Sequence, residues 1–237
     1  MKGGGFVSEQ KESIFKKAKR SRSYLKIGVA GPSGSGKTYG ALLIASGLVN
    51  DIEKVCVIDT ENGSANLYDH LGTYTVVDFS PPFHPDRYSN IIAMAVEQGF
   101  EVIIIDSTSH EWDGQGGCLD LHQKFGGDFR DWKKVTPLHN KFINSILQAR
   151  AHVICCTRKK TDYSMENSGG KTKVRKVGMK EIQRDGFEYE LTVAFDINVD
   201  HIATSSKDRT GLFPNTQPFT ITEETGKALR EWNEGKS

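Results

Sequence analysis

The chain has 237 residues, a length that one α/β domain can reach, and we expect a single folded domain. Its 31 Lys and Arg residues nearly balance 30 Asp and Glu residues, so the net charge of +1 neither favours nor excludes a polyanionic partner. No apolar run approaches the ~18 residues of a membrane span, and the amino terminus lacks the apolar core of a signal peptide. The four cysteines form no C-x-x-C pair, as is typical of a reduced intracellular protein. We therefore expect a soluble cytoplasmic protein that is not attached to a membrane.

Residues 1–23 form a basic amino-terminal segment, in which Lys and Arg cluster between Lys11 and Arg22. Its few apolar residues, such as Phe6 and Phe15, cannot make an independent core, so we expect a basic arm or a short docking helix. That helix would pack on the main body or on a neighbouring subunit. Contact of the arm with nucleic acid is the sharper interpretation, and a merely solvated face is the simpler one.

The stretch Gly31-Pro-Ser-Gly-Ser-Gly-Lys-Thr38 fits the phosphate-loop pattern G-x-x-x-x-G-K-[ST] in full. A short apolar run precedes it and apolar residues at helical spacing follow it from Ala41 to Leu48. We expect Lys37 to reach the β and γ phosphates of ATP and Thr38 to offer its hydroxyl to Mg²⁺. The predicted nucleotide-binding residues are Gly31, Pro32, Ser33, Gly34, Ser35, Gly36, Lys37, Thr38 and Tyr39.

Two further strand-like runs end in acids. Val55 to Glu61 is a buried-strand pattern that stops at polar residues, and we expect Asp59, Thr60 and Glu61 to lie beside the nucleotide. Glu61 is the candidate base that orients the attacking water, although a solvated loop glutamate would look the same. The second run ends at Asp106, the predicted second Mg²⁺-associated residue, so Thr38 and Asp106 form the predicted metal pair.

Between and after these strands the pattern predicts a strand from Tyr74 to Phe79 and a helix that begins at Asp86. Residues 108–136 are too long for a structureless loop, so we expect a partly helical segment that carries part of the ligand surface. Its aromatic residues either stack on unpaired bases or pack in the core.

His110-Glu111 does not extend to H-E-x-x-H, and the histidines lack sulfur partners at zinc spacing, so no structural metal is predicted. Thr136-Pro137 predicts the start of the next helix.

A buried strand from His152 to Thr157 leads into a strongly basic segment, residues 158–184, which carries nine basic and three acidic residues. With Ser168-Gly169-Gly170 at its middle, it resembles a mobile basic hairpin or loop that follows a phosphate backbone, or else a solubilising loop. The candidate DNA-binding residues are Arg158, Lys159, Lys160, Lys171, Lys173, Arg175 and Lys176. We name Lys171, Lys173, Arg175 and Lys176 the hairpin basic set. From Leu191 onward, alternation and turns predict antiparallel strands that extend the parallel sheet.

The phosphate loop and the ends of the strands at Glu61 and at Ile-Ile-Asp-Ser107 occur in the order of the RecA-type recombinase core, which this chain resembles over residues 24–213. The resemblance implies a RecA-like P-loop core across 24–237, with a mainly parallel twisted sheet flanked by helices and an antiparallel C-terminal extension. It implies that Glu61 activates water, and that Lys207 and Arg209 reach a neighbouring subunit's nucleotide in trans. Thr157 and Arg158 stand where recombinases have an Asn-Gln pair and are candidate γ-phosphate sensors.

Residues 178–189 and 206–210 also resemble small phage-encoded ATPases of this class that assist single-strand annealing. If the chain is phage-encoded, its place is the host cytoplasm. The leading hypothesis is a DNA-stimulated ATPase that binds single-stranded DNA and promotes annealing or recombination as a homo-oligomer, either a ring or a filament. A single-strand-binding protein is a further candidate partner. Three alternatives remain open: a hexameric helicase-type motor, a small-molecule P-loop kinase, and a nucleotide-gated binding protein with negligible turnover.

Overall fold

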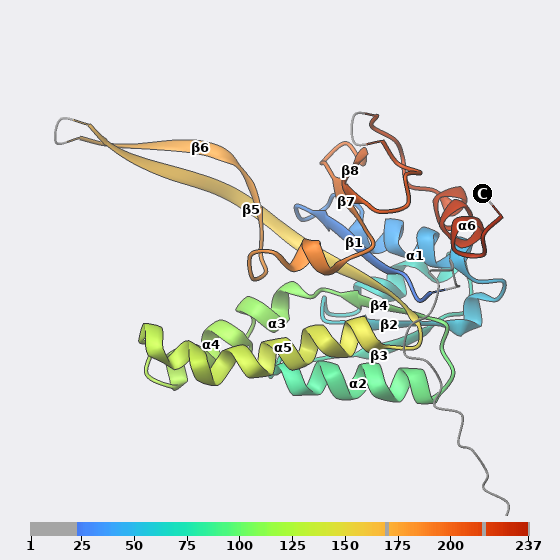
Figure 1. Cartoon of the computed structure of the whole chain (residues 1–237), viewed down its shortest axis with the longest axis horizontal. Coiled ribbons are helices and arrows are strands. Elements are labelled where there is room, and N and C mark those ends of the chain that lie inside the picture. The colour runs from blue at the N-terminus through green and yellow to red at the C-terminus, as the bar shows by residue number, and fades with distance from the viewer. Residues whose placement is uncertain (1–22, 169–170, 215–216, 237) are drawn as a thin grey trace, which may run out of the picture.

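A computed structural model describes residues 23–168, 171–214 and 217–236, and for residues 163–168 and 171–177 the backbone alone. Its main sheet has the strand order β3-β2-β4-β5-β1-β7-β8 (Figure 1). All neighbours from β3 to β7 run parallel, and β8 is antiparallel to β7. The fold is therefore the expected α/β fold with a mainly parallel sheet and an antiparallel extension. The strands are β1 (Lys26–Gly31), β2 (Val55–Asp59), β3 (Thr75–Asp78), β4 (Val102–Asp106), β5 (His152–Ser168), β7 (Val193–Ile197) and β8 (Ala203–Asp208).

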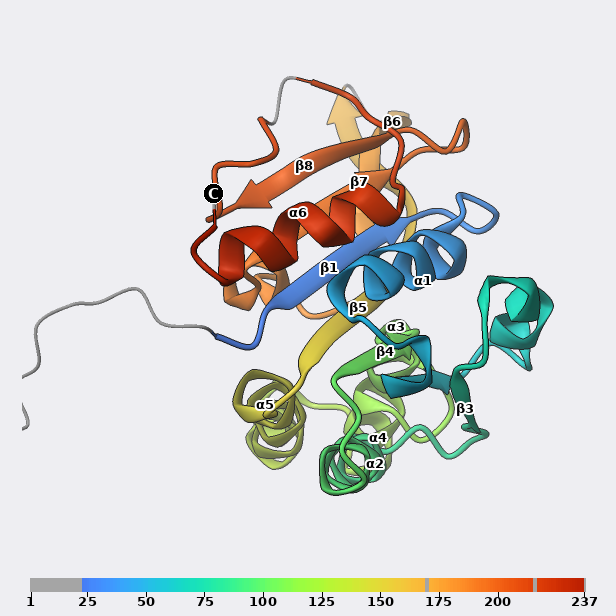
Figure 2. The same cartoon turned by 90° about the vertical axis from the view of Figure 1, so that its right-hand side faces the viewer.

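Helices cover both faces of the sheet because the strand side chains alternate between two apolar cores. In β4, Val102 and Ile104 pack into one core and Ile103 and Ile105 into the other. The first core includes α1 (Lys37–Leu48) and α6 (Glu223–Asn233), and the second includes α2 (Pro85–Glu97) and α5 (Trp132–Gln148). Figure 2 shows the two pairs on opposite sides of the strands. The remaining helices are α3 (Ser109–Asp113), α4 (Cys118–Lys124), η1 (Ile52–Lys54), η2 (Ser64–Leu71), η3 (Phe129–Asp131) and η4 (Phe187–Glu190).

Two glycines let α6 lie directly against α1. A Cβ at Gly47 would come 2.1 Å from the carbonyl oxygen of Glu223, and one at Gly226 would come 2.1 Å from that of Ile44. Only residues without a side chain fit this crossing. The contact brings the segment before α6 to the amino-terminal end of α1, where the phosphate loop lies.

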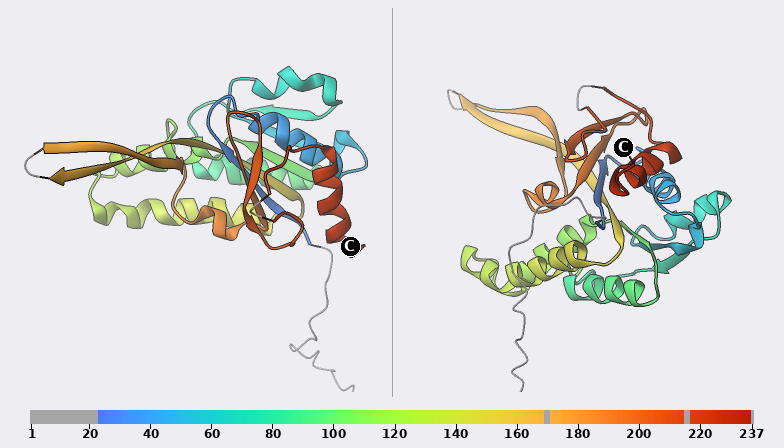
Figure 3. Two further views of the ribbon diagram at one scale, coloured as in Figure 1. Left: turned by 90° about the horizontal axis from the view of Figure 1, so that it is seen from above. Right: turned by 45° about the vertical axis from the view of Figure 1, so that its right-hand side comes forward.

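Strand β5 is much longer than its neighbours because it leaves the sheet and continues into a hairpin. Its outer half pairs in antiparallel fashion with β6 (Lys171–Glu181), with a register shift between Asp162 and Tyr163. Figures 1 and 3 show this hairpin projecting from the body on the same side as α4. The basic segment of residues 158–184 is thus largely a β-hairpin.

The predicted helix start at Thr136-Pro137 is wrong. Helix α5 begins at Trp132, directly after η3, and a capping box at Asp128 satisfies the amide groups at the start of η3. Pro137 lies on an exposed position of α5, where water can satisfy the carbonyl that loses its amide partner. The segment of residues 108–136 is largely helical, built from α3, α4, η3 and the start of α5.

The basic arm of residues 1–23 lies outside the described residues except for Ser23, whose amide donates to Asn233 Oδ1 at 3.0 Å. In the part of the chain that the structure describes, no helix has the length and apolar character needed to span a membrane.

Candidate functional site

The phosphate loop joins β1 to α1 and depends on its glycines for its shape. Gly34 and Gly36 have φ angles of 79° and 88°, which side chains rarely adopt. A Cβ on Gly31 would lie 2.5 Å from both Ser35 Oγ and the carbonyl oxygen of Ile197. No side chain caps the amino terminus of α1, so its first amide groups are available to an anion.

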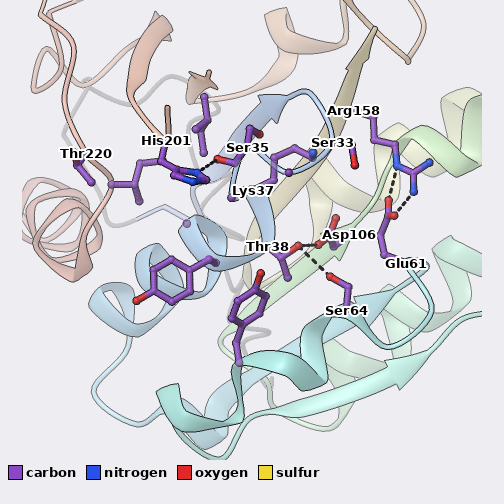
Figure 4. A pocket seen from close by; sticks show the side chains of 17 residues that line it. Ser33, Ser35, Lys37, Thr38, Glu61, Ser64, Asp106, Arg158, His201 and Thr220 are labelled. Carbon is purple, nitrogen blue, oxygen red and sulfur yellow. Dashed lines mark hydrogen bonds and ion pairs between the residues drawn. The ribbon is translucent and has the colours of Figure 1, made fainter. Parts of the chain in front are cut away.

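A cavity of about 540 Å³ opens over this loop at the carboxyl ends of β1 and β4 (Figure 4). Its volume falls in the range of small-molecule sites. Gly31 and Pro32 precede the part of the loop that lines it. The sequence-predicted residues that do line it are Ser33 to Tyr39, Glu61, Asp106 and Arg158.

The predicted metal pair is in direct contact. Thr38 Oγ1 donates to Asp106 Oδ2 at 2.5 Å, and Asp106 is 2% exposed. Burial raises the pKa of the Asp106 carboxyl to about 6, although the hydrogen bond from Thr38 opposes the rise. Mg²⁺ binds through one or two protein oxygens together with water and phosphate oxygens. A buried carboxylate beside a hydroxyl fits that ion, because a cation there offsets the cost of ionising the acid.

The lysine and one serine of the loop also fit a phosphate. Lys37 is 9% exposed, and its Nζ donates to the carbonyl of Pro32 at 2.9 Å, which holds the ammonium group at the loop. Ser35 Oγ is buried and has no hydrogen-bond partner among the described residues. A phosphate would therefore meet an ammonium group, free helix amides and an unsatisfied hydroxyl.

Glu61 and Arg158 form a two-point ion pair at the edge of the cavity (Figure 4). Arg158 Nε donates to Glu61 Oε1 at 2.7 Å, and its Nη2 donates to Oε2. Burial would raise the pKa of Glu61, but the hydrogen bonds and the positive charge of Arg158 outweigh it and leave that pKa below its ordinary value. Asp59 Oδ1 accepts the Glu61 amide at 2.6 Å and so fixes its backbone. Glu61 is ionised, but both of its carboxylate oxygens accept hydrogen bonds from Arg158. It must separate from Arg158 before it can accept a proton from water.

A family comparison agrees with this geometry. A family model described as "AAA domain" matches residues 23–225, which is most of the chain. The chain belongs to the AAA domain family. The match supports a P-loop ATPase core, and with it nucleotide binding and hydrolysis. No curated protein matches the chain.

Two other polar residues at the strand ends of this AAA domain lie behind the cavity. Thr157, a sensor candidate, is 2% exposed, and its Oγ1 lies 3.0 Å from Thr108 Oγ1. Thr60 is also buried, and its hydroxyl accepts the amide of Ser107 at 2.7 Å. Neither lines the cavity, so both support the strand ends that carry the Glu61–Arg158 pair.

The candidate trans-acting residues face away from this chain's own nucleotide cavity. Lys207 Nζ donates to the carbonyls of Glu188 and Tyr189, and Arg209 Nη2 donates to that of Tyr189 at 3.1 Å. Lys207 lines a separate hollow of about 620 Å³, and neither residue is among the described residues that line the nucleotide cavity. Lys207 belongs to the end of β8, the edge strand of the sheet, and Arg209 directly follows that strand.

The candidate DNA-binding residues divide into three groups. Arg158 is held by Glu61, and Lys159 Nζ lies 2.7 Å from Asp196 Oδ1, so both already have carboxylate partners. Lys160 is exposed near the base of the hairpin. The hairpin basic set lies on β6, and its side chains are outside the described part of the structure.

The sequence did not identify several lining residues that reach the cavity from other elements. His201 Nδ1 lies 3.0 Å from the carbonyl oxygen of Ser35, and the Tyr68 ring lies 5.4 Å from that of Tyr39. No motif marks them, because they converge only through the pairing of β7 with β1 and the packing of η2 on α1. The lining residues missed are Gly40, Ser64, Tyr68, Ile197, His201, Thr220 and Ile221.

Proposed function

We propose that this AAA domain is a Mg²⁺-dependent ATPase that binds single-stranded DNA through the β5–β6 hairpin and promotes annealing or recombination as a RecA-like homo-oligomer. The observation that carries the proposal is the course of β5. This one strand holds Arg158 at the nucleotide cavity and continues without interruption into the basic hairpin. A polyanion on the hairpin and the candidate base Glu61 are therefore connected through a single strand.

Each group of cavity residues has a separate role in ATP hydrolysis. Lys37 and the amides at the start of α1 bind the phosphates and stabilise charge that develops on the transferred group. Thr38 and Asp106 would hold Mg²⁺, which neutralises the β and γ phosphate oxygens when bound. Glu61, once released by Arg158, accepts the proton of the attacking water. Arg158 then has its guanidinium free for the γ-phosphate.

The hairpin supplies the proposed DNA contact. The hairpin basic set and Lys160 would neutralise backbone phosphates, and such contacts release counterions and depend strongly on salt. The hairpin projects from the body, so a strand can reach both of its faces (Figure 3). Phe129, in η3 between α4 and α5, is 90% exposed and available to stack on an unpaired base.

The proposed oligomer rests on Lys207 and Arg209. Neither lines its own nucleotide cavity, and both lie at the end of the edge strand, which suits a role in which they reach a neighbour's nucleotide. Positive charge borrowed in this way stabilises the transition state only when subunits are stacked.

ATP hydrolysis with and without single-stranded DNA tests the proposal, followed by annealing of complementary strands. Hydrolysis by the wild type should rise on addition of DNA, and the Lys37→Ala variant should lose about 100-fold or more of it. Replacement of the hairpin basic set by alanine should remove the DNA response and leave basal hydrolysis. Lys54→Ala serves as the matched control, because it removes an exposed charge from the end of η1, just before β2.

DNA that leaves hydrolysis unchanged in the wild type would reject the DNA-stimulated part of the proposal. ATP consumption that instead requires a small-molecule acceptor would favour the kinase alternative. Unwinding of forked duplexes would favour the helicase alternative.

A further inference from the structure

A buried cluster of three metal-ligating side chains lies beside the nucleotide site. Glu111 belongs to α3, Cys118 to α4 and His139 to α5, and none is more than 4% exposed. Cys118 Sγ donates to Glu111 Oε1 at 3.0 Å, and His139 Nδ1 lies 3.1 Å and 3.3 Å from the two Glu111 oxygens. One ligand atom from each residue lies within 4.8 Å of the other two.

The charge of Glu111 needs a partner. Glu111 has no exposed surface, and a carboxylate that loses its hydration is destabilised unless a positive charge compensates. Among the described residues the only ion pair of Glu111 is with His139, and Gln183 adds a longer contact from its Nε2 at 3.4 Å. Because the imidazole carries charge only when it is protonated, a cation between the three side chains would supply the compensating charge.

We propose that Glu111, Cys118 and His139 bind one Zn²⁺ ion. A thiolate, an imidazole and a carboxylate are all preferred ligands of Zn²⁺, whereas Mg²⁺ and Ca²⁺ take oxygen ligands. Donors at about 2.0–2.3 Å from a tetrahedral ion are roughly 3.3–3.7 Å apart, so small side-chain movements bring the present contacts to that spacing. The fourth position is left to a water molecule.

The charge and proton balance favour this ion. Zn²⁺ binding replaces the thiol proton of Cys118 with a Zn–S bond and releases one H⁺, and the ion then faces one thiolate and one carboxylate with no net charge. Zinc affinity should therefore fall as pH is lowered.

The position of the cluster gives the ion a structural role. Glu111 lies five residues after Asp106, and Gln183, at the base of the hairpin, donates both to the carbonyl of Thr108 at 3.0 Å and to Glu111. Figure 1 shows α3, α4 and α5 side by side on the hairpin side of the sheet. An ion that ties these three helices would hold the surface between the nucleotide site and the hairpin.

Metal content of the purified full-length protein tests the proposal, with Cys118→Ser as the decisive variant. Serine keeps a hydroxyl that can donate to Glu111, so a purely hydrogen-bonded cluster tolerates it, but serine does not replace a thiolate as a zinc ligand. We expect about one Zn²⁺ per chain in the wild type and a loss of about tenfold or more in Cys118→Ser and His139→Ala. Cys56→Ser, which changes another buried cysteine, and Asp106→Asn, which changes the nucleotide site, should keep the ion.

Co²⁺ added to chelator-treated wild-type protein gives a second readout that needs no variant to fold. Coordination by Cys118 produces thiolate-to-cobalt charge-transfer absorption. Absence of that absorption, a wild-type zinc content near zero, or full retention of zinc in a folded Cys118→Ser protein would each overturn the proposal.

Discussion

Replacing Asp106 with Asn should stabilise the ligand-free protein while it abolishes hydrolysis. The Asp106 carboxyl is fully buried, and its pKa rises from 3.8 to about 6 in the folded protein. That change corresponds to about 3 kcal/mol at a pH where the acid must ionise in both states. Asn keeps an oxygen that accepts the hydrogen bond from Thr38 but carries no charge. The free energy of unfolding of the variant should therefore exceed that of the wild type by up to about 3 kcal/mol at pH 7.

The sign of the pH dependence gives a sharper test. Because the folded pKa is raised, the unfolded chain loses the Asp106 proton first, and the wild type loses this part of its stability as pH rises from about 4 to above 6. The difference between variant and wild type should thus be near zero at pH 4 and largest at pH 7. Urea unfolding at both pH values, without nucleotide or Mg²⁺, measures it.

Mg²⁺ and ATP should reverse the order of stability, so that the wild type becomes more stable than Asp106→Asn. They stabilise only a folded protein that binds them, so the wild type should gain stability with their concentration and Asp106→Asn should gain much less. An Asn variant that is less stable than the wild type at pH 7 without ligand, or a difference that does not change with pH, would refute this account of the site.

Three further predictions concern Arg158, the hairpin and the basic pair at the end of β8. Arg158→Ala removes the charge and hydrogen bonds that lower the pKa of Glu61, so burial should then raise that pKa. The pH below which the rate of hydrolysis falls should therefore be higher in the variant than in the wild type. If this pH is the same in both proteins, Glu61 is not the base. Alanine at the hairpin basic set should reduce the log–log salt slope of single-strand binding by about 3, at ~0.7 per phosphate contact, and an equal slope would indicate a solubilising hairpin. A mixture of Lys37→Ala with a Lys207→Ala, Arg209→Ala double variant should recover hydrolysis that neither has alone. If both fold and co-assemble but the mixture stays inactive, the basic pair does not act in trans.

Local motifs allowed the sequence to predict the phosphate loop and the acids around it. Residues 31–38 specify a strand, a glycine-rich turn and a helix within one short stretch, so little else in the chain can change their geometry. Asp106 ends one strand that is buried on both faces and Glu61 follows another, and parallel packing brings the ends of such strands to one edge. The sheet as a whole followed from the same apolar runs.

The rest depended on tertiary contacts that spacing does not encode. The start of α5 was misplaced because a capping box at Asp128 and an exposed Pro137 permit a longer helix than the proline signal indicated. His201 reaches the loop only because β7 pairs with β1. Cys118 and His139 are 21 residues apart in no metal-binding pattern, and only the packing of α4 on α5 brings them together.

The Glu61–Arg158 pair is the element through which we expect DNA to stimulate hydrolysis. A ligand shifts an equilibrium only by its difference in affinity between two states, so DNA can accelerate hydrolysis through this pair only if it binds better when Arg158 has left Glu61. Both legs of the hairpin begin at this point: Arg158 is on β5, and its carbonyl accepts the amide of Ile182 at 2.8 Å from the end of the other leg. A change in the pairing of the hairpin base therefore alters the backbone that aims the guanidinium. The Arg158→Ala protein has no such pair to release, so DNA should still bind its hairpin but no longer change its rate of hydrolysis. DNA stimulation that survives in this variant would show that the signal reaches the nucleotide by another route.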